Sequence, residues 1–166
     1  MFRVAPYSSE KLFEIDDDDV VSPESETEEE DIRPVAVESI KPKRILVVDD
    51  EQFMLQFLQG VLEEEGFLIN TAANGVEGLR MAKREIPDLI ITDYNMPEMD
   101  EVELIRKLRN KLSTSYIPTM ILTGVDEIDS EIESLNFGAD DYELKPVNAR
   151  KLISRVNRLL KRQSSS

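Results

Sequence analysis

The chain has 166 residues, with 20 lysines and arginines against 35 aspartates and glutamates, for a formal net charge of −15. It contains neither cysteine nor histidine, which excludes disulfides, thiolate and Ser-His-Asp catalysis, and any metal site without oxygen ligands. The acidic balance argues against direct binding to nucleic acid or to membrane surfaces, and no apolar run is long enough to span a bilayer. Because the first residues also lack the apolar core of a signal peptide, we expect a cytoplasmic protein.

The amino-terminal part differs from the rest of the chain in its charge. Residues 1–40 hold 3 basic and 13 acidic side chains, with acidic runs at 16–19 and 24–31. A segment of this kind repels itself and buries little apolar surface, so we predict a disordered acidic linker over residues 16–41. An acidic docking tail for a basic partner is the alternative. Residues 1–15 are left unassigned, and their scattered apolar side chains fit the end of an upstream domain in a longer protein.

From residue 43 onward, apolar runs typical of buried strands alternate with apolar stripes at helical spacing. The predicted strands cover residues 44–48, 67–72, 88–92, 119–122 and 141–144. The predicted helices cover residues 53–62, 76–85, 102–112, 128–135 and 152–160. Gly66, Pro87 and Gly138 follow the first, second and fourth helices, where glycine and proline end helices.

Five strand–helix units in strict alternation predict an α/β fold, in which helices cover both faces of a parallel sheet. Right-handed crossovers restrict the topology further. Five such units suit a doubly wound, flavodoxin-like (βα)5 arrangement with strand order 2-1-3-4-5.

Polar residues stand directly after the apolar runs of four predicted strands. Asp49 and Asp50 follow the first, Asp93 the third, Thr123 the fourth and Lys145 the fifth. In a doubly wound sheet the carboxyl ends of the strands form the binding edge, so these side chains should converge there. Three neighbouring carboxylates repel one another unless a cation lies between them, and Mg²⁺ prefers such oxygen ligands. With a lysine and a hydroxyl beside them, they suit phosphoryl transfer to a carboxylate.

Each of these residues has an ordinary structural explanation when taken alone. The aspartate pair can mark a helix cap, with Asp50 or Glu51 near the first turn, and Asp93 can be a loop residue. Thr123 can be a strand-end residue and Lys145 a surface lysine. Their joint placement at one edge of one sheet is what favours a functional site.

Four stretches carry a resemblance to a known family. They are residues 45–51 (Ile-Leu-Val-Val-Asp-Asp-Glu), 88–97 (Asp-Leu-Ile-Ile-Thr-Asp-Tyr-Asn-Met-Pro), 121–123 (Ile-Leu-Thr) and 138–146 (Gly-Ala-Asp-Asp-Tyr-Glu-Leu-Lys-Pro). In these motifs residues 43–162 resemble the receiver domain of two-component response regulators, similar to chemotaxis regulators. We therefore expect a receiver domain over residues 42–163, followed by a short tail at 164–166.

The resemblance implies a set of site residues. Asp93 would be the phosphoacceptor, and Asp49, Asp50, Asp93 and the backbone carbonyl of Asn95 would hold Mg²⁺. Lys145 would pair with the phosphoryl group, while Thr123 and Tyr142 would move on phosphorylation. Gly124, a small residue, and Val125 occupy positions that modulate the site in the family.

The resemblance also implies partners. A sensor histidine kinase or a histidine phosphotransfer protein would supply the phosphoryl group, since the chain has no histidine of its own. The face made by the fourth helix, fifth strand and fifth helix would then change its binding to a downstream protein, a fused output domain or a second copy of the chain. Such a protein is a switch with slow loss of its own phosphoryl group, not an enzyme.

Two other functions fit the same residues. One is a receiver-like interaction module that is never phosphorylated, and the other is a Mg²⁺-dependent phosphatase that acts on an external substrate. The sequence also departs from the family at Glu101, where glycine is common. If that glycine has a positive φ angle, Glu101 should strain or reshape its loop.

Overall fold

The computed structural model describes residues 40–124, 135 and 137–165. The chain divides into two units, Met1–Ile40 and Lys41–Ser166, and the elements below belong to the second. The predictions for residues 1–15, for the linker up to residue 39, for residues 128–134 of the fourth helix and for Val125 lie outside the described residues. They stay predictions.

Five parallel strands form one sheet in the order β2-β1-β3-β4-β5, which confirms the predicted topology. All five apolar runs that were expected to form strands do so, with ends within one residue of the predicted ones. The strands are β1 (Arg44–Val48), β2 (Leu68–Ala72), β3 (Leu89–Asp93), β4 (Thr119–Thr123) and β5 (Asp141–Leu144).

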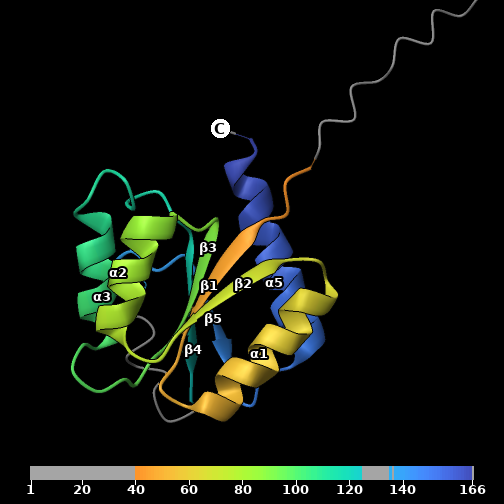
Figure 1. Cartoon of the computed structure of the whole chain (residues 1–166), viewed down its shortest axis with the longest axis horizontal. Coiled ribbons are helices and arrows are strands. Elements are labelled where there is room, and N and C mark those ends of the chain that lie inside the picture. The colour runs from red at the N-terminus through yellow and green to blue at the C-terminus, as the bar shows by residue number, and fades with distance from the viewer. Residues whose placement is uncertain (1–39, 125–134, 136, 166) are drawn as a thin grey trace, which may run out of the picture. The chain divides into compact units, whose positions relative to one another are not determined.

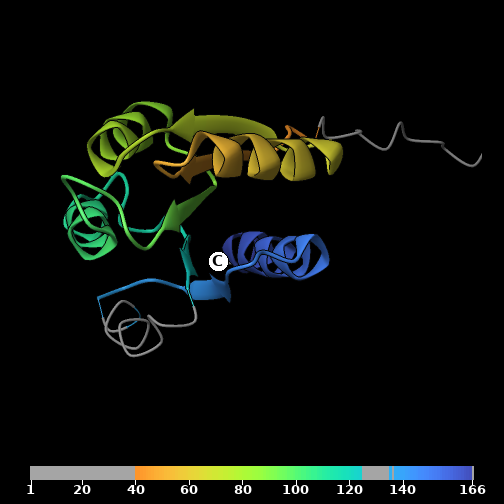
Figure 2. The same ribbon diagram turned by 90° about the horizontal axis from the view of Figure 1, so that it is seen from below.

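Helices cover both faces of the sheet (Figures 1 and 2). The helices α1 (Gln52–Glu64) and α5 (Ala149–Gln163) lie on one face, and α2 (Gly75–Glu85) and α3 (Glu101–Arg109) lie on the other. Alternate residues of β1 enter the two cores, since Ile45 and Val47 pack toward α1 and α5, whereas Leu46 and Val48 pack toward α2 and α3. The sheet is therefore apolar on both faces, as its continuous apolar runs predicted.

The ends of α1 and α2 follow from local residue chemistry. Gly66 adopts a φ of 87° and ends α1, as the sequence indicated. Asn74 caps α2, because its side-chain oxygen accepts a hydrogen bond of 2.8 Å from the backbone N–H of Glu77. At the other end of α2, Ile86 takes a left-handed conformation with a φ of 46°.

The third helix is shorter than predicted. The apolar pattern suggested an end near Leu112, but α3 ends at Arg109. The Thr114 hydroxyl donates a 2.8 Å hydrogen bond to the carbonyl oxygen of Leu108, and the backbone N–H of Thr114 bonds to Lys111. This turn satisfies the last carbonyls of the helix and leads the chain back toward β4. No helix among the described residues is long and apolar enough to cross a membrane.

Candidate functional site

The carboxyl ends of β1 and β3 bring two aspartates side by side. The register pairs Val48 with Thr92, so Asp49 and Asp93 are the next residues of two hydrogen-bonded strands. The backbone N–H of Asp49 donates to the carbonyl oxygen of Ala72 at 3.1 Å, and that of Tyr94 donates to Leu122 at 2.9 Å. Hydrogen bonds to β2 on one side and to β4 on the other therefore hold the backbone at the two aspartates in place.

Asp50 completes a cluster of three carboxylates. One oxygen from each of Asp49, Asp50 and Asp93 lies within 4.8 Å of the other two. Asp49 is fully buried and Asp93 is 6% exposed, whereas Asp50 faces solvent. Carboxylates this close to one another favour a bound cation, and their oxygen atoms are the donors that Mg²⁺ takes.

The two oxygens of Asp49 differ in their surroundings. Oδ1 accepts a 2.8 Å hydrogen bond from the backbone N–H of Glu51. Oδ2 is buried without a hydrogen-bond partner in the described part of the chain, and its charged neighbour, Nζ of Lys145, is 3.9 Å away. A buried carboxylate oxygen without a hydrogen bond is unfavourable by itself, and a cation between the three aspartates would satisfy it.

The helix-cap alternative is met in position by Glu51, but neither aspartate of the pair caps α1. The residue that caps α1 is Glu51, and its side chain makes no capping hydrogen bond. Asp49 instead turns its side chain onto the N–H two residues later, as aspartates in turns often do. The sequence analysis did not predict this hydrogen bond from the Glu51 backbone to Asp49. An aspartate directly before a tight turn could have indicated it.

Lys145 reaches the cluster from β5. Its Nζ lies 2.7 Å from Oδ1 of Asp93, and its backbone N–H donates to the carbonyl oxygen of Thr123 at 2.7 Å. The peptide bond to Pro146 is cis. The lysine expected at the end of the fifth strand therefore pairs directly with the aspartate expected at the end of the third.

Burial and charge set the ionisation of these groups. Burial, reinforced by Asp93 and opposed by the Glu51 hydrogen bond, raises the pKa of Asp49 from 3.8 to about 6. Burial also raises the pKa of Asp93, although its hydrogen bond to Lys145 works in the other direction. Burial tends to lower the pKa of Lys145, but its contact with Asp93 outweighs this and raises it.

The other expected site residues lie around this centre. Thr123 is buried at the end of β4 and Gly124 follows it, and Asn95 stands two residues beyond Asp93 in the loop before α3. Tyr142 is half-buried on β5, where it packs with Ile121 and has the Arg155 guanidinium 5.9 Å from its ring. The positions of these side chains relative to a phosphoryl group stay predictions.

The loop after Asp93 differs from expectation at one residue. Glu101 does not have a positive φ angle; it is the first residue of α3 and is 2% exposed. The left-handed residue of this loop is Glu98, with a φ of 71°. Glu101 itself is therefore not strained by a left-handed backbone, and the turn of this loop lies three residues earlier. The buried side chains of Met96 and Met99 anchor the loop, and the sequence analysis did not assign them a role.

Known proteins share the sequence and the fold of this site. Residues 45–157 match the sequence model of the response regulator receiver domain. The chain belongs to this family. The receiver is 40% identical over 120 residues, or 72% of the chain, to the alkaline phosphatase synthesis transcriptional regulatory protein PhoP of Bacillus subtilis. It is 38% identical over 74% of the chain to the transcriptional regulatory protein PrrA of Mycobacterium tuberculosis.

Solved structures agree with this assignment. A receiver domain protein from Clostridium thermocellum shares 33% identity with a TM-score of 0.70, over 74% of this chain and 97% of that one. A putative response regulator from Chloroflexus aurantiacus shares 32% identity with a TM-score of 0.71, over 73% and 99%. In contrast, the receiver spans about half the length of its curated relatives, with 49% of PhoP and 52% of PrrA covered.

Proposed function

We propose that this receiver is a phosphorylatable switch with Asp93 as its phosphoacceptor. The observation that carries the proposal is the cluster of Asp49, Asp50 and Asp93, with Nζ of Lys145 2.7 Å from Asp93. Both Asp49 and Asp93 are buried, but only Asp93 of these two has Nζ of Lys145 within hydrogen-bond distance, at 2.7 Å against 3.9 Å for Asp49. A partly buried carboxylate held by a lysine is oriented for attack on a phosphorus atom, since positioning and charge neutralisation dominate phosphoryl transfer.

The proposed reaction exchanges one bond to phosphorus for another. A carboxylate oxygen of Asp93 forms a bond to phosphorus as the bond from phosphorus to the donor imidazole nitrogen breaks. The donor nitrogen keeps the electron pair of the broken bond and, with a proton on the other ring nitrogen, leaves as a neutral imidazole, while Asp93 becomes an acyl phosphate. The donor is a histidine kinase or a histidine phosphotransfer protein, because this chain has no histidine.

The residues fit a magnesium site. Asp49, Asp50 and Asp93, together with the backbone carbonyl of Asn95, would hold the ion, and the unpaired Oδ2 of Asp49 supports this donor set. Bound Mg²⁺ would supply positive charge beside the transferred phosphoryl oxygens. Lys145 contributes the second positive charge, and the Thr123 hydroxyl contributes a hydrogen bond to the phosphoryl group.

The change at Asp93 would be transmitted through β4 and β5. A phosphoryl group adds about −1.5 to −2 charge and three strong acceptors. It would compete for Lys145 and draw Thr123 toward itself, which frees Tyr142 to move inward between β5 and α5. The face that includes β5 and α5 would then bind a downstream protein, a fused output domain or a second copy. The relatives named as transcriptional regulators suggest an output in transcription, and the cytoplasmic location expected from the sequence stays a prediction.

Intact mass spectrometry tests the proposal. We expect one added phosphoryl group after incubation with a small acyl phosphate and Mg²⁺, and none on Asp93→Asn. Asp88→Asn is the matched control, because Asp88 lies at the opposite end of β3 and should leave the addition intact. Phosphate on Asp93→Asn would refute the assignment. No addition to the natural chain would favour the interaction module that is never phosphorylated.

A further inference from the structure

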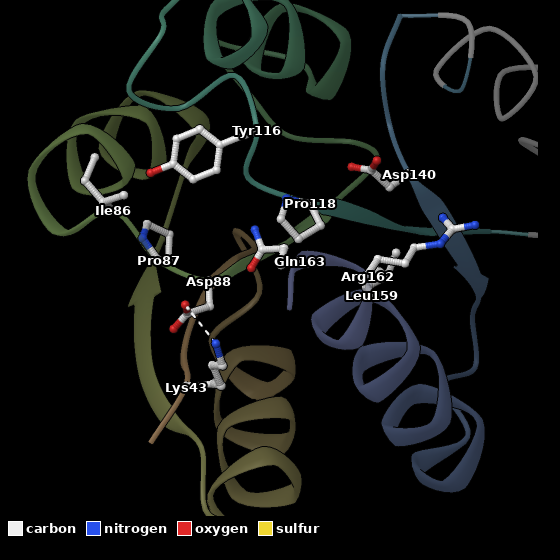
Figure 3. A pocket seen from close by; sticks show the side chains of 10 residues that line it. All are labelled: Lys43, Ile86, Pro87, Asp88, Tyr116, Pro118, Asp140, Leu159, Arg162 and Gln163. Carbon is white, nitrogen blue, oxygen red and sulfur yellow. Dashed lines mark ion pairs between the residues drawn. The ribbon is translucent and has the colours of Figure 1, made fainter. Parts of the chain in front are cut away.

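A groove lies at the amino ends of the strands, opposite the carboxylate cluster (Figure 3). Its volume is about 640 Å³, within the range of ordinary ligand sites. The start of β1, the connections before β3, β4 and β5, and the last turn of α5 all contribute to it. The lining residues are Lys43, Ile86, Pro87, Asp88, Tyr116, Pro118, Asp140, Leu159, Arg162 and Gln163.

The floor and walls of the groove are apolar and firmly held. Pro87, Pro118 and Leu159 are buried and give it an apolar surface, and Tyr116, which is 62% exposed, lines its other end near Ile86 (Figure 3). The prolines restrict the two connections they belong to, and Ile86 is fixed in a left-handed turn. A site with such walls is formed before a partner arrives, which reduces the entropy lost on binding.

The acidic residues of the groove are already occupied by internal donors. One oxygen of Asp88 accepts a 2.8 Å hydrogen bond from the backbone N–H of Arg44, and the other lies 3.7 Å from Nζ of Lys43. Asp140 accepts from the backbone N–H of Thr119 at 2.8 Å and from Arg109 at 2.9 Å. Their negative charge is therefore largely compensated within the fold.

Two basic residues near the end of α5 are not compensated in this way, Arg162, which lines the groove, and Lys161, which lies beside it on the outer face of the helix. Neither has a side-chain partner among the described residues, and both are exposed. Arg162 also borders a second, shallow groove on the outer face of α5, together with Ser154, Asn157, Arg158, Lys161 and Ser165. Positive charge without an internal partner is therefore present both on the outer face of α5, at Lys161, and at the apolar groove, at Arg162. We call Lys161 and Arg162 the terminal cations.

We propose that this groove binds a short acidic peptide segment of a partner protein that also carries an apolar side chain. The carboxylates would lie along the terminal cations, with the Gln163 amide and the Tyr116 hydroxyl as further hydrogen-bond donors. The apolar side chain would pack on Pro87, Pro118 and Leu159. Acidic side chains outnumber basic ones in the chain, so such a peptide is attracted only where basic side chains gather, as the terminal cations do beside an apolar surface. The same repulsion disfavours a nucleic acid, whose phosphates need a wider basic surface.

The site is separate from the phosphorylation chemistry. The groove begins beside Lys43, just before β1, whereas the carboxylate cluster begins at Asp49, just after it. At about 3.3 Å per residue, the five residues of β1 put roughly 15 Å between the two ends. A bound peptide would leave Asp93 open to its phosphodonor.

Fluorescence anisotropy with the full chain tests the proposal. The probe is a labelled peptide of about ten residues, rich in Asp and Glu around one Leu, in low salt. We expect saturable binding that weakens about tenfold or more in the double variant Lys161→Glu, Arg162→Glu. The matched control is Arg150→Glu, Lys151→Glu, which makes the same change of net charge in the first turn of α5 and should weaken binding less than about twofold.

NMR titration and changes of the ligand test the proposal further. Amide NMR signals of Tyr116 and Gln163 should shift on titration of the natural chain, which locates the peptide without any variant. Equal losses in the two double variants would overturn the proposal, because they would show attraction by net charge alone. Equal binding of the same peptide with Gln and Asn in place of its acids would also overturn it. So would tighter binding of a DNA duplex with the same dependence on the terminal cations.

Discussion

At the scale of single residues, Asp49 combines complete burial with an oxygen that accepts no hydrogen bond from the described residues. In the folded chain its carboxyl keeps a proton up to about pH 6, whereas a free aspartate loses it near 3.8. The folded state therefore binds more protons than the unfolded state between these values. Ionisation must then destabilise the metal-free fold as the pH rises from about 4 to about 6, and the full penalty is present above that range.

Asp49→Asn should remove this penalty. At about 1.4 kcal/mol per pKa unit, we expect the free energy of unfolding at pH 7 to rise by about 1–3 kcal/mol and its fall with pH to flatten. Urea denaturation between pH 4 and pH 8, with a chelator present, measures both. Glu65→Gln removes one negative charge from an exposed position just beyond α1 and serves as the control. An Asp49→Asn variant no more stable than the natural chain at pH 7 would contradict the electrostatic account of the site.

Mg²⁺ should stabilise the natural chain for the same reason. An ion that binds only the folded state adds about 2.7 kcal/mol at a hundredfold excess over its Kd. We expect the melting temperature to rise with Mg²⁺ concentration in the natural chain and to respond much less in Asp49→Asn and Asp50→Asn. Calorimetry or dye-based melting measures this rise. An equal Mg²⁺ response in all three proteins would place the ion elsewhere.

At the scale of elements, the contact between α2 and β1 depends on a glycine. A Cβ atom built at Gly78 would lie 2.8 Å from Cγ2 and 3.0 Å from Cγ1 of Val48. Val48 is fully buried and immediately precedes Asp49, so α2 would have to move away from the strand that carries the site. Gly60 in α1 has nothing within 4 Å of the same atom.

The two glycines therefore predict opposite effects of the same substitution. Gly78→Ala should lower the free energy of unfolding by about 1–3 kcal/mol through overpacking. Gly60→Ala should raise it by about 0.5–1 kcal/mol, because alanine has the better helix propensity and no neighbour is disturbed. Denaturant unfolding of both variants compares them directly. Stabilisation by Gly78→Ala would show that α2 is free to shift.

The elements also show what the sequence could and could not predict. Strand ends were predictable because four of the five apolar runs stop at a charged or hydroxyl residue, such as Asp49 or Lys145. The end of α3 was not, since it depends on the Thr114 hydroxyl bonding back to Leu108. The Asp93–Lys145 contact joins two strands that are not adjacent, so periodicity alone gave only the shared edge. The groove at the opposite edge could not be predicted, because segments from five places in the sequence, the segment before β1, three connections and the end of α5, build it.

At the scale of the whole molecule, charge is distributed very unevenly. The chain has a net charge of −15, yet α5 contains no acidic residue and six basic ones, Arg150, Lys151, Arg155, Arg158, Lys161 and Arg162. Arg155 and Arg158 pair with buried carboxylates of β5, so they hold the helix to the edge strand. The remaining four cations form no ion pair within the part of the chain that the structure describes, so they can meet a partner. The helix thus fastens the fifth strand to the domain and also presents positive charge at its surface.

Lys145 links the carboxylate cluster to that strand. Its Nζ pairs with Asp93, its backbone N–H bonds to Thr123, and Tyr142 stands three residues before it on β5. If this lysine transmits the change, Lys145→Ala should still fold and still accept a phosphoryl group, more slowly, but should lose the response at Tyr142. The physical reason is that a phosphoryl group shifts a two-state element only through contacts that differ between the states.

NMR of the tyrosine ring signals, with phosphate incorporation followed by intact mass, measures the two effects separately. In the natural chain we expect the Tyr142 signal to shift in proportion to the fraction phosphorylated. In Lys145→Ala the signal should stay at its unphosphorylated position even when mass shows the added group. Lys111→Ala removes the same charge from the exposed turn after α3 and should keep the full shift. A Lys145→Ala protein whose Tyr142 signal still follows phosphorylation would assign the coupling to Thr123 and β4, because the backbone bond from Lys145 to Thr123 survives the substitution.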